Sequence, residues 1–232
     1  MASIRFPEGQ QRSGSSGGLV FSHNRYGAYI RARSIPVNPM TPRQQVIRGR
    51  ATFLSQYWRE VLLESEREAW EVYAQATPVP NKWGDPVHLT GLNHFLRSNS
   101  ARLESSMTVL KVAPAVPGLS SADYTLYATA SEATQKITLI FITGIIGWNN
   151  HDDWALLAYQ GSPVAASRRF FGGPWRVFAN LVGSTAVPVT SPQAVDVTFP
   201  IAVGQKCWIY HRVLDATGRL SEKLEHSFLV GA

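Results

Sequence analysis

The chain has 232 residues, of which 44% are hydrophobic, a formal net charge of +6 and a single cysteine. This length and composition provide for one sizeable core or two small ones and favour two folded units. A lone cysteine, Cys207, excludes an internal disulfide framework. The longest strongly apolar run, residues 137–146, is interrupted by polar residues and is far shorter than the roughly 20 residues of a membrane-spanning helix, so we expect no membrane partner. The first residues lack the apolar stretch of a secretory signal, so we expect no export by that route.

Positive charge is concentrated at the N-terminal end. The first 59 residues contain nine arginines, no lysine and one acid, Glu8, which gives this segment a charge of +8. Residues 60–110 carry −3 and residues 111–232 carry +1. This asymmetry indicates a polyanionic or acidic partner for one end of the molecule rather than for its whole surface.

Residues 1–40 are predicted to form an extended basic arm, because serine, glycine and proline are frequent there and disfavour a helix. Aromatic and aliphatic side chains alternate with arginines. Tyr29, Arg31 and Arg33 would share one face of a strand, with Ile30 on the other face. Two interpretations remain open: a disordered tail, or a strip that becomes ordered along a neighbouring subunit.

Residues 41–110 are predicted to form a small helical domain. A capping box of Thr41 and Gln44, with proline at the first helical position, predicts a helix over residues 42–62. A second capping box at residues 65–68 predicts another helix, which pairs with the first as a hairpin. Thr90 opens a weaker third helix. The large aromatic residues of this region are predicted to pack in its core rather than to bind a ligand: Trp58, Trp70, Tyr73, Trp83 and Phe95.

Residues 111–122 have a linker composition of proline, glycine and serine, and residues 123–232 are predicted to form an all-β domain. Short segments of alternating hydrophobicity are separated by turn residues at the spacing typical of a β-sandwich. We expect about seven strands, over residues 124–130, 136–142, 153–160, 175–183, 194–201, 206–214 and 221–230. The predicted fold class is therefore α+β and multidomain.

Two parts of the chain resemble known families. The first string of motifs is Tyr26-Gly27-x-Tyr29-x-Arg31-x-Arg33, Pro36-x-Asn38-Pro39-x-Thr41-x-x-Gln44, Arg48, Trp58 and Glu66-Arg67-x-Ala69-Trp70-x-x-Tyr73-Ala74. Over roughly residues 18–98 it resembles a group of uncharacterised proteins from tailed phages and prophage-like bacterial loci. This resemblance implies a structural protein of a virion or appendage, with virion localisation and no associated activity.

The second resemblance concerns the C-terminal part. The hairpin at residues 207–221 resembles the final two strands of a fibronectin type III domain, and the similarity extends over roughly residues 112–230 with Trp154 in the third-strand region. An insertion at residues 162–174 departs from a minimal domain of that family. The resemblance implies an immunoglobulin-like sandwich that serves packing and presentation, because such a fold does not by itself imply a function.

No motif of catalytic chemistry is found in the sequence. His151, Asp152 and Asp153 are adjacent in a predicted turn and cannot all converge on one metal ion without help from elsewhere. The other histidines are scattered, and no nucleophile elbow or phosphate-binding glycine loop is present. We therefore expect no enzyme, no cofactor, no metal and no small-molecule substrate. A helix-turn-helix DNA-binding motif is disfavoured because the second predicted helix is acidic.

Three functions remain. The first is a virion structural protein, a capsid decoration, connector or tail component, whose partners are further copies of itself and other virion proteins, with packaged DNA as a further candidate. The second is a nucleic-acid-binding protein that uses the arginine-rich arm. The third is a glycan-binding or adhesion module that uses Trp148, Trp154 and Trp175. The residues predicted to contact a protein or DNA partner are Arg25, Tyr26, Tyr29, Arg31, Arg33, Arg43, Arg48, Arg50, Arg168 and Arg169.

Overall fold

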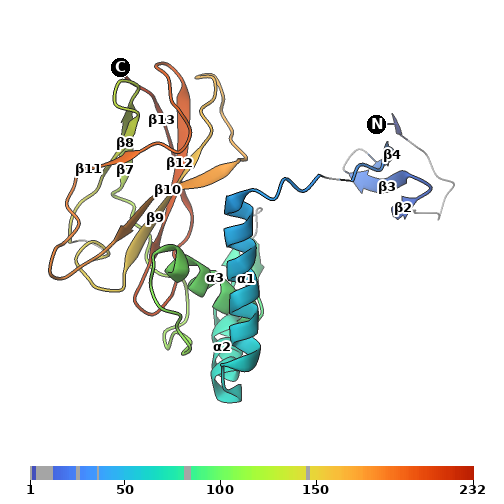
Figure 1. Ribbon diagram of the computed structural model, residues 1–232, viewed down its shortest axis with the longest axis horizontal. Coiled ribbons are helices and arrows are strands. Elements are labelled where there is room, and N and C mark those ends of the chain that lie inside the picture. The colour runs from blue at the N-terminus through green and yellow to red at the C-terminus, as the bar shows by residue number, and fades with distance from the viewer. Residues whose placement is uncertain (1, 4–12, 25–26, 36, 81–84, 145–146) are drawn as a thin grey trace. The chain divides into compact units, whose positions relative to one another are not determined.

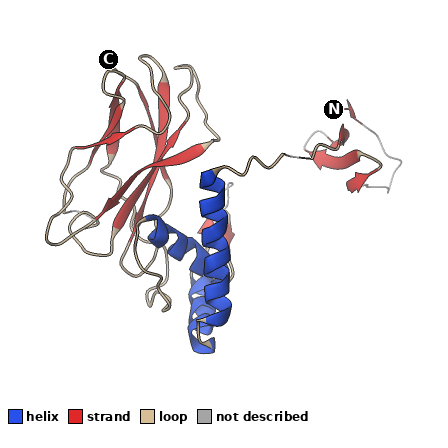
Figure 2. Ribbon diagram, in the orientation of Figure 1, coloured by secondary structure: helices blue, strands red, loops and turns tan. Residues whose placement is uncertain are grey.

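The computed structural model describes residues 2–3, 13–24, 27–35, 37–80, 85–144 and 147–232. These residues form three helices and four antiparallel sheets, so the predicted α+β class is confirmed (Figures 1 and 2). The chain divides into two compact units, Met1–Gln45 and Val46–Ala232. Below, they are called the N-terminal unit and the body.

The N-terminal unit contains one four-stranded sheet with the order β1-β4-β3-β2. Its strands are β1 (Ala2–Ser3), β2 (Gly14–Ser16), β3 (Leu19–Asn24) and β4 (Gly27–Ala32). The sequence predicted extended chain here, and the structure adds the pairing of that chain with itself: β3 pairs with both β2 and β4. The prediction missed this pairing because the alternation of apolar and polar residues does not reveal which strands pair.

Two of the three predicted helix starts are confirmed. Helix α1 (Pro42–Glu60) begins at the predicted capping box, in which the Gln44 backbone N–H donates to the Thr41 hydroxyl and the Thr41 N–H donates to the Gln44 side chain, at 3.4 and 3.3 Å. Helix α3 (Gly91–Glu104) begins after Thr90, whose hydroxyl accepts from the Asn93 N–H.

The predicted start of the second helix is wrong. Helix α2 (Glu64–Ala76) is capped by Leu63, whose backbone N–H donates to the Glu66 carboxylate at 2.8 Å. The predicted box at residues 65–68 lies inside the first turn. A carboxylate at the third helical position can bond back to the backbone of any capping residue, so the hydroxyl of Ser65 was a misleading marker.

The body combines the helices with two sheets that enclose a common core. One sheet has the order β10-β9-β12-β13 and the other β11-β8-β7. Their strands are β7 (Tyr127–Ser131), β8 (Lys136–Ile140), β9 (Ala155–Gly161), β10 (Trp175–Val182), β11 (Gln193–Asp196), β12 (Lys206–Leu214) and β13 (Leu224–Leu229). Seven strands were predicted and all seven are present, with bounds that differ by a few residues. A short two-stranded sheet, β5 (Val79–Pro80) with β6 (Pro86–Val87), lies between α2 and α3 in the chain.

The core between the two sheets is built from alternating residues of β12 and its neighbours. Cys207, Ile209 and Val213 are fully buried on β12, and Ile137 and Leu139 on β8 face them within the same cluster. Alternation along a strand places one face of each sheet in the core, which stabilises each fully buried aliphatic side chain by about 1.5–3 kcal/mol. Cys207 is therefore a small residue of the core.

The helices pack on each other through aromatic rings. Trp70, Tyr73 and Phe95 are buried in one cluster with Leu54, and the Trp70 and Phe95 rings meet edge to face with centroids 5.6 Å apart. The prediction that these aromatics form a core is confirmed for the three buried rings. Trp58 is half-buried beside Phe95, and Trp83 lies outside the described residues.

The helices and the sheets of the body share a third cluster. Ala101 of α3 packs against Leu157 of β9 and Leu214 of β12. Polar contacts reinforce it, because Arg102 is 2% exposed and donates to the Thr108 carbonyl at 2.8 Å and towards Asp153 at 3.4 Å. The segment predicted as a linker also packs: the Trp70 indole donates to the Lys111 carbonyl, and the Tyr73 hydroxyl donates to the Gly118 carbonyl. Residues 111–122 are therefore held against the helices by hydrogen bonds.

Candidate functional site

The N-terminal sheet has two chemically different faces. Cross-strand pairing places Tyr29 opposite Ser22 and Arg31 opposite Val20, while Ile30 lies opposite Phe21. Arg33 continues the Tyr29 and Arg31 face one residue beyond β4. Successive side chains of a strand alternate between faces, so one face carries Tyr29 and Arg31 together with Val20 and Ser22, and the other carries Phe21 and Ile30. This is the arrangement that the sequence predicted for β4.

The N-terminal sheet is a single layer. Among described residues 13–45, no side chain whose exposure is described is buried, and Leu19 is 41% exposed. A sheet with an apolar face buries that face against a second layer in stable folds, and a small sheet alone is marginal in water. The described part of this unit contains no such layer.

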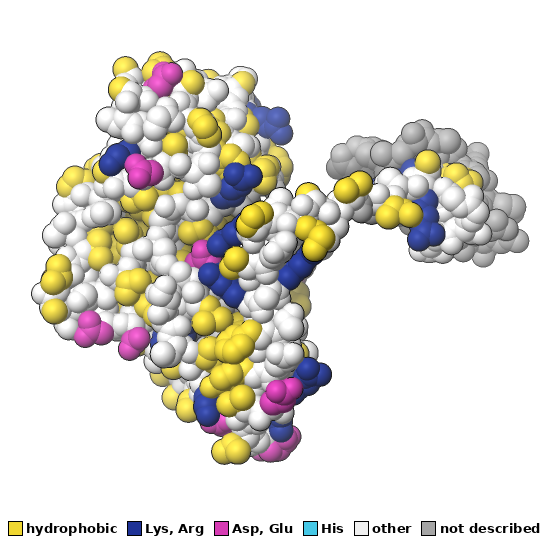
Figure 3. Space-filling view, viewed as in Figure 1, with side chains coloured by type: hydrophobic (Ala, Val, Ile, Leu, Met, Phe, Trp, Pro, Cys, Tyr) yellow, Lys and Arg dark blue, Asp and Glu magenta, His cyan; other side chains and the backbone are white. Residues whose placement is uncertain are grey.

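The predicted contact residues of α1 differ in their availability. Arg43 and Arg48 are exposed, whereas Arg50 is half-buried and forms an ion pair with Glu104 at the end of α3. That pair joins two helices of the body, so it gives Arg50 a structural role. Exposed hydrophobic residues, Val46 and Phe53, accompany these arginines, and Figure 3 shows hydrophobic side chains over α1. Arg25 and Tyr26 lie outside the described residues.

The remaining predicted residues, Arg168 and Arg169, lie in the loop before β10. Both are exposed, and the Arg168 Nε donates to the Phe170 carbonyl at 3.2 Å. Phe170 is 74% exposed, whereas Phe171 is buried against Trp175. The predicted residues thus occupy three separate elements, the N-terminal sheet, α1 and this loop.

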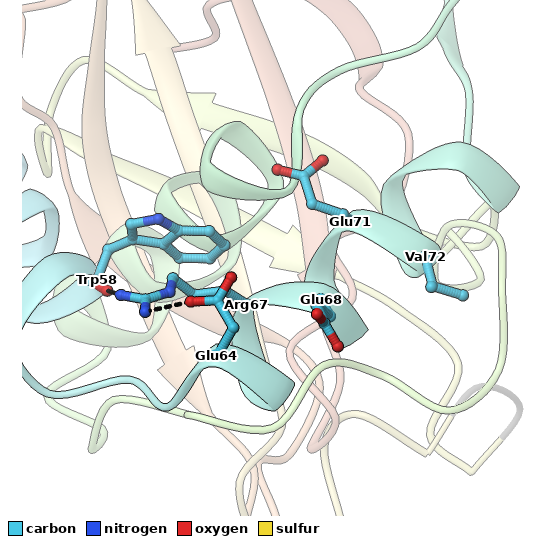
Figure 4. A pocket seen from close by; sticks show the side chains of 6 residues that line it. All are labelled: Trp58, Glu64, Arg67, Glu68, Glu71 and Val72. Carbon is cyan, nitrogen blue, oxygen red and sulfur yellow. Dashed lines mark hydrogen bonds and ion pairs between the residues drawn. The ribbon is translucent and has the colours of Figure 1, made fainter.

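A groove that was not predicted lies where α1 ends and α2 begins. It encloses about 570 Å³ and is lined by Trp58 of α1 and by residues of α2: Glu64, Arg67, Glu68, Glu71 and Val72 (Figure 4). The three carboxylates come at positions i, i+4 and i+7, which is one face of a helix. We call this the acidic groove. The sequence shows that the second helix is acidic, which disfavours DNA binding, but it does not show that this helix lines a groove.

The charges of the acidic groove are only partly neutralised. Arg67 pairs with Glu64 at 2.6 Å and also donates to the carbonyls of Trp58 and Arg59, so it is committed to holding the end of α1. Glu71 accepts the Gly91 backbone N–H at 2.8 Å with one oxygen. Among the described residues, the Glu68 carboxylate has neither a hydrogen-bond partner nor an ion-pair partner. The groove therefore presents net negative charge beside an indole ring.

The aromatic residues on the outer face of the β9–β12 sheet form a closed cluster. Tyr159 and Tyr210 stack with centroids 4.4 Å apart and planes at 10°, and Trp175 meets Tyr210 edge to face. The Lys223 Nζ lies 4.6 Å from the Trp175 ring centroid and 4.5 Å from that of Tyr210. Because sugars stack on free ring faces, and these faces are covered by one another and by lysine, the cluster offers little platform for a glycan.

The other tryptophans considered for glycan binding are not displayed either. Trp148 is 1% exposed and its indole donates to the Asp123 carboxylate at 2.8 Å, so this ring is not available for the glycan-binding alternative. Trp154 precedes β9 and packs partly buried against the sheet core. Aromatic content alone could not distinguish a core ring from a displayed one.

The groups considered for chemistry have structural partners. Asp152 accepts the backbone N–H and the hydroxyl of Thr185, and these bonds lower the pKa of its carboxyl. Burial raises the pKa of the Cys207 thiol to about 11, which keeps it protonated and unreactive at neutral pH. Within the described residues, no three metal-ligating side chains converge. No helix in that part of the chain is both long and apolar enough to cross a bilayer.

Comparison with protein-family models and with curated protein sequences gives no match. Among solved structures, a family 76 glycoside hydrolase from a bovine Bacteroides thetaiotaomicron strain is similar to part of the chain, with a TM-score of 0.33 and 12% identity. The similarity covers 47% of this chain and 20% of the hydrolase chain. A similarity this low carries no argument about fold or function.

Proposed function

We propose that this protein is a non-enzymatic structural component of a tailed-phage virion that assembles through its N-terminal unit. The observation that carries the proposal is the single-layer sheet of that unit, in which no side chain of described exposure is buried. An apolar sheet face without its own second layer is stabilised when another chain covers it. A subunit contact would supply the missing layer.

The body supports the proposal as a rigid carrier. We infer that its C-terminal part is a fibronectin type III-like sandwich, an inference supported by the strand orders β11-β8-β7 and β10-β9-β12-β13 and by the core they enclose. Buried Arg102 and the shared cluster around Ala101 join the helices to this sandwich. A body with this architecture can present surfaces at fixed positions.

The test is incorporation into particles. In the phage or prophage that encodes the chain, we expect the protein to sediment with purified particles and a variant without residues 1–40 to be absent from them. Circular dichroism of that truncated variant checks that the body remains folded. Normal incorporation of the truncated, folded variant would contradict an assembly role for the N-terminal unit.

Nucleic-acid binding is the second candidate, and the arginine composition favours it. Exposed Arg31 and Arg33 lie on one face of the N-terminal unit, and a guanidinium matches a phosphate with two parallel hydrogen bonds. In this alternative, packaged DNA takes the place of the neighbouring subunit. Direct binding of a labelled DNA duplex, with an affinity that falls steeply as salt rises, tests this alternative.

A further inference from the structure

The acidic groove carries charge that its own helix does not balance. Glu64 and Glu68 are four residues apart on α2, and like charges at this spacing destabilise a helix. Both side chains are exposed, and the one arginine of the groove, Arg67, already pairs with Glu64 and caps α1. A cation supplied from outside would remove this repulsion.

The shape of the groove suits a guanidinium. Trp58 forms one wall of the groove, and Val72, which is 71% exposed, adds an apolar surface at the other end of the groove (Figure 4). Arginine combines a planar cation, which stacks on an indole ring, with a fork of donors that matches a carboxylate. The volume of about 570 Å³ falls within the range of roughly 300–1,000 Å³ typical of binding sites.

The same chain supplies the complementary surface. Arg31 and Arg33 are exposed and lie on one face of the N-terminal sheet, with Cα atoms roughly 7 Å apart, as expected for alternate residues of an extended strand. Glu64 and Glu68 are separated by roughly 6 Å along the axis of α2. Two arginines on one face of an extended segment can therefore meet two carboxylates on one face of a helix in register. A DNA backbone would be repelled by the same groove.

We propose that the acidic groove of one copy receives Arg31 and Arg33 from the N-terminal unit of a second copy. This inference rests on the proposed assembly function and names the contact through which copies recognise one another. Contacts of this kind are weak singly and act together with coverage of the apolar sheet face. Association is therefore expected to weaken as salt rises.

The experiment mixes two complementary variants and measures association by sedimentation velocity. The arm variant is Arg31→Ala with Arg33→Ala, and the groove variant is Glu64→Gln with Glu68→Gln. We expect the full-length wild type to associate and each variant alone to associate at least tenfold more weakly. An equimolar mixture should recover association between unlike chains, because one intact arm then meets one intact groove. Fluorescent labels of two colours identify the unlike pairs.

Matched controls separate the contact from general charge effects. Arg168→Ala with Arg169→Ala removes two exposed arginines elsewhere, and Glu222→Gln removes an exposed carboxylate of the sandwich. Both should associate as the wild type does. Circular dichroism checks that the groove variant remains folded, because Glu64→Gln relieves repulsion with Glu68 but also removes the ion pair with Arg67. A folded groove variant that associates normally would overturn the proposal, and so would a mixture that recovers nothing.

Failure of the groove contact is distinguishable from failure of the assembly role. If removal of residues 1–40 abolishes association while the groove variant associates normally, the assembly role stands and the groove contact is wrong. If that removal leaves association unchanged, both are wrong. If association appears only after duplex DNA is added and is indifferent to the groove variant, the arm binds nucleic acid and the groove proposal is overturned.

Discussion

His211 and His226 form a stacked pair inside the body, with ring centroids 5.2 Å apart and planes at 6°. One His211 nitrogen contacts the Asp123 carbonyl at 2.9 Å, while His211 Nδ1 and His226 Nε2 have no partner among the described residues. Burial lowers the pKa of both rings, that of His211 to about 4. The folded chain therefore keeps both imidazoles neutral.

This pair predicts loss of stability in mild acid. The unfolded chain takes up a proton on His211 near pH 6.5, whereas the folded chain does so near pH 4. The stabilisation that the neutral His211 ring contributes to the fold is therefore complete above pH 6.5 and is lost as the pH falls to about 4. A pKa shift of this size changes the free energy of unfolding by about 3 kcal/mol. Urea titrations between pH 7 and pH 4 measure it. His211→Gln, which cannot be protonated there, should show a flatter profile, and an equal slope in both proteins would contradict the prediction.

Some residue positions could be predicted from the sequence and others could not. The alternation on β12 places Cys207 in the core, and helical spacing places Trp70 there. The same reasoning treated Arg50 as a surface contact, although it pairs with Glu104, 54 positions further along the chain. A local pattern carries no information about a partner brought close only by the fold.

Helices α2 and α3 approach closely at Gly91. A Cβ built on that residue would lie 2.7 Å from the Glu71 backbone nitrogen and 2.8 Å from the Trp70 carbonyl carbon. Backbone atoms cannot move aside as a flexible side chain can. Gly91 therefore allows the start of α3 to touch the middle of α2, beside the acidic groove.

Gly91→Ala should destabilise the body by about 1–3 kcal/mol, as expected for overpacking at a close contact. Gly49→Ala is the matched control, because Gly49 lies in α1 with open space around its Cβ position, and alanine there should stabilise the helix by up to about 1 kcal/mol. Thermal unfolding followed by circular dichroism measures both. A Gly91→Ala protein as stable as wild type would show that the helices separate more easily than the structure indicates.

The elements themselves were predictable to different degrees. The start of α1 follows from Thr41 and Gln44, and the seven strands of the body follow from alternation and turn residues. The sheet of the N-terminal unit was predicted only as extended chain, since β3 and β4 have apolar alternation but no marker of register. The acidic groove could not be predicted as a groove, because Trp58 and Glu68 become neighbours only after α1 turns into α2.

Across the body, the helices and the two larger sheets are expected to unfold together. Buried Arg102 donates to the Thr108 carbonyl and towards the Ala216 carbonyl at 3.5 Å, and Asn180 of β10 donates to the Glu104 carbonyl at 2.6 Å. Burial lowers the pKa of neighbouring Arg97 to about 10, and its guanidinium donates to the Leu220 carbonyl. These contacts connect α3 to strand β10 and to the segment that follows β12.

Arg102→Ala should cost about 3 kcal/mol or more, because it leaves a cavity and buried carbonyls without donors. We also expect the single unfolding transition of the body to split into two, since the helices and the sheets would lose their main polar connection. Tryptophan fluorescence and circular dichroism in urea measure this. Arg59→Ala, at an exposed position of α1, is the control and should stay within about 0.5 kcal/mol of wild type. A single unshifted transition in Arg102→Ala would contradict the account.

The nucleic-acid alternative makes its own prediction. If the N-terminal unit binds DNA, the logarithm of the binding constant should fall linearly with the logarithm of salt concentration, with a slope of about −0.9 for each phosphate contacted. Arg31→Ala with Arg33→Ala should then reduce the magnitude of the slope by about 2. Fluorescence anisotropy with a labelled duplex measures this. Absent or salt-independent binding would remove the alternative.

The central claim is that the N-terminal unit joins copies of this chain or joins it to other virion proteins. Sedimentation equilibrium of the full chain, compared with a chain that begins at Thr41, tests it most directly. Assembly through the N-terminal unit predicts reversible association of the full chain that weakens with salt, and a folded monomer for the shortened chain. A monomeric full chain at every concentration, with the N-terminal sheet protected from hydrogen exchange, would contradict it.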